Sequence, residues 1–144
     1  MKEDLKIIFP VSMRSVKMAD DVFEAVARNA SRESRIVYAI RTVLSEAFSN
    51  AFLYGDKQNE DAVIEFGVCF KDNKFVASII NEGKGFTDNN INWEEFPSVA
   101  QESGRGLQLI KKFSDKVEFR KLDGGRFEVY VEIFTESKDK VINS

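Results

Sequence analysis

One polar pair in the middle of the chain has residue types that can bind a metal ion or move a proton. Glu46 and Asn50 lie four residues apart in the segment 45–51, which reads SEAFSNA. On a helix, this spacing puts both side chains on one face. A carboxylate and an amide oxygen are hard ligands that suit magnesium, and a carboxylate can also orient or deprotonate an attacking hydroxyl. The alternative is a polar helix edge with an ordinary side-chain hydrogen bond.

Two pairs of closely spaced glycines flank a long polar segment. The first pair is Gly83 and Gly85, and the second is Gly104 and Gly106. Glycine lets backbone amides approach a ligand closely. The second pair opens a predicted helix, whose free N–H groups and dipole suit a phosphate. The pattern favours a lid over a nucleotide at residues 87–103, and two ordinary loops with flexible turns are the alternative.

A single asparagine stands close to the first glycine pair. Asn81 comes two residues before Gly83, at the end of a predicted strand. In this place its amide can hydrogen-bond a ligand that the following loop helps to hold. An asparagine that serves only to form a turn is the alternative.

The missing residue types exclude several kinds of chemistry. The chain has no His, which excludes a Ser-His-Asp triad, a His general base, His zinc ligands and a phosphohistidine mechanism. Its one cysteine, Cys69, allows neither an intrachain disulfide nor a Cys-based zinc site. Any metal must therefore have oxygen ligands, which favours magnesium or calcium. The net charge of −3 argues against a general nucleic-acid binder.

The length and the hydrophobic content predict one domain with a packed core. The chain has 144 residues, of which 43% are hydrophobic and 13 are Phe. Its charged start, MKED, does not fit a signal peptide, and no apolar run approaches membrane-spanning length. We expect a single domain over 1–144 in the reducing cytoplasm, away from membranes, with an ordered core at 5–134 and a frayed tail at 135–144.

Apolar periodicity predicts how these candidate residues are positioned. The expected elements are a strand at 5–9, a helix capped by Ser15, a helix at 32–54, a hairpin of strands at 64–70 and 75–80, a helix at 106–113, and a hairpin built from 117–119 and 127–133. Such an order indicates an α+β fold, a two-layer α/β sandwich. Its mixed, mostly antiparallel sheet should be covered on one face by helices.

Taken in order, the motifs resemble those of the Bergerat-fold (GHKL, histidine-kinase-like) ATPases, a superfamily that includes histidine-kinase ATP domains and gyrase. The motifs are Glu46-x-x-x-Asn50-Ala51 on a helix, Asn81-x-Gly83-x-Gly85 after a strand, and Gly104-Arg105-Gly106-Leu107 after the lid. The small size and the Ser-Gly-Arg-Gly-Leu form are most similar to the anti-sigma-factor serine-protein kinases. Three motifs in the right order are more specific than any one of them.

The resemblance implies a role for each matching residue. Asn50 would coordinate the magnesium that bridges the phosphates of ATP, and Glu46 would act as general base or position the nucleophile. The residues that would border the adenine pocket or cradle the phosphates are Asn81, Gly83, Gly85, Gly104, Arg105, Gly106 and Leu107.

The resemblance also implies an activity and partners. Proteins of this kind are ATP-dependent protein serine kinases that phosphorylate an anti-anti-sigma (STAS-domain) partner. The unphosphorylated partner releases a sigma factor from the kinase. Family members are commonly homodimers, and no direct contact with nucleic acid or membranes is implied.

Two residues depart from the family pattern. Asn81 stands where the family usually has an aspartate that accepts a hydrogen bond from the adenine amino group. Loss of the charge is expected to weaken that bond by on the order of 1 kcal/mol. Tyr54 stands where a histidine often precedes the glycine. The first departure leaves a second hypothesis for the function open, in which the protein is a catalytically weak or inactive switch that sequesters a regulator. A third is a stand-alone protein of this fold that acts on another two-component-like partner.

Overall fold

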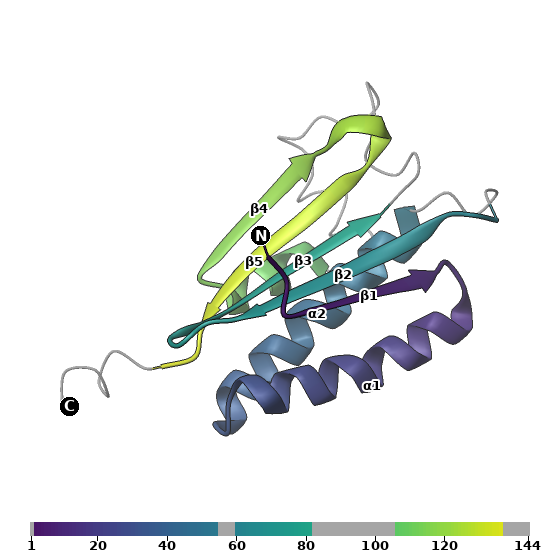
Figure 1. The fold of residues 1–144 in the computed structure, drawn as a ribbon. Helices are drawn as coiled ribbons and strands as arrows, with labels where there is room; N and C mark the ends of the chain where they lie inside the picture. Colours follow the sequence, from purple (N-terminus) through teal and green to yellow (C-terminus); the bar gives the residue numbers. More distant parts are fainter. Residues whose placement is uncertain (1, 55–59, 82–105, 137–144) are drawn as a thin grey trace.

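Five antiparallel strands form one sheet, and the helices gather on one of its sides (Figure 1). The computed structural model describes residues 2–54, 60–81 and 106–136. Its elements are β1 (Leu5–Pro10), α1 (Met13–Ala30), α2 (Ser34–Tyr54), β2 (Val63–Phe70), β3 (Lys74–Asn81), α4 (Gly106–Phe113), β4 (Lys116–Lys121), the short turn η2 (Asp123–Gly125) and β5 (Phe127–Phe134). The predicted α+β fold with two layers is confirmed.

The strand order in the sheet is β1-β2-β3-β5-β4. All four pairings are antiparallel, so the described part of the sheet is not mixed. β1 lies at one edge, as expected for a strand that ends at Pro10, because proline cannot donate to a strand ladder. β3 lies in the centre, and its last residue, Asn81, pairs with Ile64 on one side and Phe127 on the other.

The first helix begins earlier than predicted. Ser12, not Ser15, is the N-cap, and its Oγ accepts a hydrogen bond from the backbone N–H of Ser15 at 3.2 Å. Ser15 is buried inside the first turn. Ser12 has the extended backbone of a cap residue, and it follows β1 after a single intervening residue. The prediction of Ser15 as cap was therefore wrong by three residues.

An aromatic cluster joins the two long helices to the sheet. The ring of Phe23 in α1 lies 5.7 Å from that of Phe48 in α2 and 5.0 Å from that of Phe66 in β2. The apolar stripe of α2 is fully buried, with Ile40 and Val43 at its centre. This packing fixes the rotation of α2, and with it the direction of the polar residues on its opposite side.

Within the described residues, no helix combines the length and the apolar character needed to cross a membrane.

Candidate functional site

The start of α4 lies against the polar pair of α2. A Cβ atom built on Gly106 would be 3.0 Å from Oε2 of Glu46 and 3.4 Å from Nδ2 of Asn50. The distance to Glu46 is tighter than an ordinary contact and the distance to Asn50 is at the short limit of one, so the missing side chain of Gly106 allows the helix to approach these two residues. The reason for glycine here is space, since its φ is not positive. The structure thus brings together Glu46, Asn50 and Gly106.

Two asparagine amides are buried without a partner. Asn50 is 6% exposed and Asn81 is 1% exposed. The Nδ2 atom of each has no hydrogen-bond partner in the described structure. A buried donor left unpaired costs roughly 1–3 kcal/mol. An unpaired N–H donor suits an acceptor such as a phosphate oxygen, so this observation fits the nucleotide that the sequence implies, whereas a magnesium ion would use the amide oxygen of Asn50.

Glu46 combines partial burial with access from the surface. Desolvation by burial raises the pKa of its carboxyl above the ordinary value of 4.5. A carboxylate with a raised pKa is a stronger proton acceptor than an exposed one. The same carboxyl borders a cavity of about 460 Å³, whose other wall includes Leu109 of α4. A hydroxyl group could therefore reach Glu46 from outside.

Three further polar residues of this cavity were missed by the sequence analysis. Arg41, Thr42 and Ser45 line it together with Tyr38. The signal was present in the sequence, because positions 38, 42, 46 and 50 recur every four residues and so share one face of α2. Apolar periodicity identifies only the opposite face of such a helix.

Several predicted site residues cannot be placed. Gly83, Gly85, Gly104 and Arg105 lie outside the described residues, as do the expected lid at 87–103 and most of the expected tail. Leu107 is described, and its side chain is buried in the core. Its backbone N–H is then the group that could face a phosphate. The described residues contain no cluster of three or more His, Cys, Asp and Glu side chains around a metal site.

Comparison with protein families decides the assignment. A model of the histidine kinase-like ATPase domain matches residues 9–132. The chain belongs to this family. The matched region of the ATPase domain contains every residue that the sequence analysis singled out, and the expected Bergerat-fold family is confirmed.

Several curated relatives of the domain have the same name, anti-sigma F factor. The anti-sigma F factor of Bacillus velezensis is 32% identical over 81 residues, which are 54% of this chain and 56% of that protein. The anti-sigma F factor of Thermoanaerobacter pseudethanolicus is 24% identical over 123 residues, 83% of this chain and 85% of that protein. The chain therefore spans only about half the length of the first relative.

Solved structures share the fold of the domain. The catalytic domain of the histidine kinase ThkA superimposes with a TM-score of 0.54 at 16% identity, covering 91% of this chain and 97% of that one. A chain of the SiaB–SiaC complex from Pseudomonas aeruginosa gives a TM-score of 0.57 at 14% identity, covering 92% and 90%. At these identities the likeness concerns the fold alone.

Proposed function

We propose that this histidine kinase-like ATPase domain binds ATP with magnesium between α2 and α4 and acts as an anti-sigma regulator with protein serine kinase activity. The observation that carries the proposal is the buried, unpartnered amide of Asn50 beside Glu46 and the close start of α4. The name of the curated relatives supports the regulatory part.

The proposed binding mode assigns three groups of this chain. When bound, ATP would supply the phosphoryl group, and magnesium would neutralise its negative charge. Asn50 offers its amide oxygen to the metal ion, directly or through water. The first turn of α4 offers backbone N–H groups that have no partner within the helix. Gly106 keeps these donors close to Asn50.

Glu46 is assigned the proton transfer. A serine hydroxyl of the partner protein enters through the cavity beside Glu46, and the carboxylate accepts its proton as the oxygen becomes the nucleophile. The partial burial of Glu46 supports this role, because desolvation raises the pKa of its carboxyl and so makes the carboxylate a stronger base. The acceptor is inferred to be an anti-anti-sigma protein with a STAS domain, and the sequestered regulator a sigma factor. We further infer a homodimer in the cytoplasm.

The proposal is tested by calorimetric titration with ATP and ADP, with and without magnesium. Asn50→Ala is expected to weaken nucleotide binding by at least about tenfold, or to abolish its dependence on magnesium. The variant keeps the backbone N–H groups at the start of α4 but has lost the side-chain oxygen that binds the metal ion. Ser49→Ala, an exposed neighbour on α2, is the matched control. Equal affinities for Asn50→Ala and wild type under both conditions would contradict the assignment.

A second candidate function is a binding switch without catalysis. Asn81 favours it, because its unpaired Nδ2 is a donor where the family's aspartate would be an acceptor. A protein that binds ATP but transfers no phosphate to any serine partner would have this function. A protein that binds no nucleotide at all would be a protein-binding module on an ATPase fold.

A further inference from the structure

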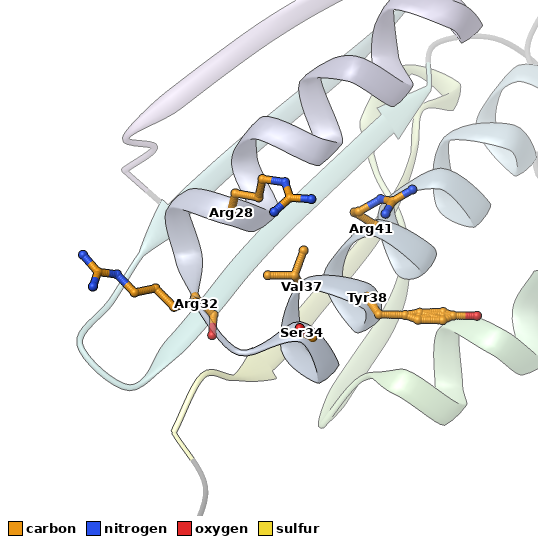
Figure 2. Close-up of a pocket in the computed structure, with 7 residues that line it drawn as sticks. Arg28, Arg32, Ser34, Val37, Tyr38 and Arg41 are labelled. Carbon is orange, nitrogen blue, oxygen red and sulfur yellow. The ribbon is translucent and has the colours of Figure 1, made fainter.

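A groove with arginines at one end and Glu46 at the other runs along α2. A cavity of about 400 Å³ at the N-terminal end of α2 is lined by Arg28, Arg32, Tyr38 and Arg41 (Figure 2). The cavity beside Glu46 shares Tyr38 and Arg41 with it. The two cavities are therefore adjoining parts of one surface feature, which we call the arginine groove.

The first half of the arginine groove is positively charged. Arg28 and Arg41 both form ion pairs with Glu24, through Arg28 Nη2 at 2.8 Å and through Arg41 Nε at 2.6 Å. One carboxylate therefore pairs with two guanidinium groups. Figure 2 shows these two side chains next to each other, both above Val37 in this view, with Arg32 extending away from them. Arg32 has no ion pair with any described residue, whereas nearby Arg35 is paired with Glu33. Even without Arg32, the two positive charges of Arg28 and Arg41 exceed the single negative charge of Glu24.

The second half of the groove has the opposite character. Glu46 lies on its wall, and next to it the hydroxyl of Ser45 donates to Oδ1 of Asp20 at 3.1 Å. A ligand that matches the whole groove must therefore be anionic at one end and carry a neutral hydrogen-bonding group at the other. A serine with acidic neighbours on one side has this distribution of charge.

The spacing along α2 sets the distance between the two parts of such a ligand. At 1.5 Å per residue, Glu46 lies about 7.5 Å beyond Arg41 and about 18 Å beyond Ser34, the first residue of α2, which also lines the first cavity. An extended peptide advances about 3.3 Å per residue. Acidic side chains that face the arginines would therefore be roughly two to five residues from a serine that faces Glu46.

We propose that the arginine groove docks an acidic segment of the protein substrate, with carboxylates two to five residues from the serine that reaches Glu46. The inference rests on the proposed kinase function and adds what the substrate must look like. Arg41 and Arg28 bind the carboxylates, and Arg41 lies more than two turns of α2 from Asn50, the proposed metal ligand. Arg41 is thus a specificity residue for the protein substrate and not for the nucleotide.

The test uses fluorescein-labelled nonapeptides with one serine and four Asp or Glu residues, placed before the serine in one peptide and after it in the other. Fluorescence anisotropy measures their binding to the full chain at low salt. Arg28→Gln/Arg41→Gln is expected to weaken binding of the better peptide by roughly tenfold or more, since charge-assisted contacts are lost. Arg35→Gln, on α2 but outside the groove, is the matched control and should bind as wild type does.

Two further measurements keep the test decisive. Each single variant is measured as well, so that the result does not depend on the double variant folding. Peptides with Gln in place of the acids should bind weakly to every variant, and added salt should weaken only the acidic peptides. Equal affinity of wild type and arginine variants would overturn the proposal. So would displacement by single-stranded DNA of equal charge at equal potency, which would make the groove a general anion surface.

The nucleotide assay separates this inference from the proposed function. Loss of peptide binding with ATP binding intact in the arginine variants supports the docking role. Unchanged peptide binding together with ATP binding that depends on Asn50 overturns the docking role alone. Absence of ATP binding to the wild type, with acidic peptides still bound through the arginines, overturns the kinase function while the groove remains a site for acidic peptides.

Discussion

The ionised form of Glu46 is unfavourable in the folded protein. Burial raises the pKa of its carboxyl, which means that folding disfavours the ionised form. At low pH this carboxyl is neutral in both the folded and the unfolded protein, so its burial carries no electrostatic cost. As the pH rises through the folded pKa, the buried carboxyl ionises and the free energy of unfolding falls. Partial burial of this kind is typical of a residue retained for chemistry and not for stability.

We predict that Glu46→Gln abolishes phosphate transfer while raising stability. Transfer should fall by at least about 100-fold, the usual contribution of a general base, with ATP affinity little changed. The free energy of unfolding should increase at pH 7, and the gain should shrink as the pH approaches 4.5, where the unfolded carboxyl protonates. Urea unfolding at several pH values measures the free energy of unfolding of the variant and the wild type. Asp21→Asn, a substitution at an exposed carboxyl, is the control. A variant less stable than wild type at pH 7 would contradict the account.

Asn81 is the residue at which nucleotide recognition can be changed most directly. Its side chain is 1% exposed and its Nδ2 is unpaired in the described structure. We predict that Asn81→Asp binds ATP several-fold more tightly, because a charged acceptor replaces a neutral one for the adenine amino group. GTP, which lacks that donor, should bind no better.

The same substitution should reduce the stability of the nucleotide-free protein, since it buries a carboxylate. Calorimetry with ATP and GTP, combined with thermal unfolding in the absence of nucleotide, gives both results. If the substitution weakens ATP binding instead, the pocket is built around the amide, and its ligand presents an acceptor where adenine presents a donor.

At the scale of elements, the regular helix faces and the hairpins could be predicted from the sequence. The apolar stripe of α2 and the alternating residues of β2 have strong periodicity, β3 is a mostly apolar run, and turn residues separate the two strands. The cap of α1 could not be predicted with the same certainty, because Ser12 and Ser15 both have the right side chain. The choice depends on where β1 ends and how the chain leaves it, which is a tertiary property.

We predict that Ser12→Ala lowers the free energy of unfolding by about 1 kcal/mol, the usual effect of losing an N-cap. The loss follows from the hydrogen bond that Ser12 Oγ accepts from the N–H of Ser15. Ser15→Ala keeps that backbone bond and should cost less, although Ser15 also accepts a hydrogen bond from Ser12 Oγ at 3.1 Å. Denaturant unfolding of both variants distinguishes them, and a larger effect at Ser15 would return the cap to the position predicted from the sequence.

At the scale of the molecule, the candidate site could be predicted only in its parts. The pair Glu46 and Asn50 was visible from spacing, and Gly106 from its place at a helix start. Their convergence depends on how α4 packs on α2, and the groove depends on how α1 places Arg28 beside Arg41. Such contacts join residues far apart in the sequence, so no local pattern contains them.

The outer face of the sheet, opposite the helices, carries a polar network. Tyr130 Oη donates to Glu132 at 2.6 Å, and Lys74 Nζ donates to the same carboxylate at 3.0 Å. The hydrogen bond from Tyr130 is the largest cause that lowers the pKa of Glu132, while burial and this bond raise the pKa of Tyr130 to about 12. Because β5 alternates, its Val129 and Val131 face the core while Tyr130 faces outward. The network and the candidate site thus lie on opposite sides of the sheet.

We predict that Tyr130→Phe lowers stability without changing ATP binding. A hydrogen bond to a charged group contributes about 1.5–3 kcal/mol. Because Tyr130 is partly exposed to water, we expect the free energy of unfolding at pH 7 to fall by an amount near the lower value. A carboxyl with a lowered folded pKa stabilises the protein above its unfolded pKa and loses that contribution as the pH falls. Wild type should therefore lose more stability than Tyr130→Phe between pH 7 and pH 3, and the two unfolding curves should converge in acid.

Tyr38→Phe, which removes the hydroxyl of an exposed tyrosine, is the control for stability. A parallel loss of ATP affinity in Tyr130→Phe would show that the two layers are coupled, because the substitution touches nothing on the helical side.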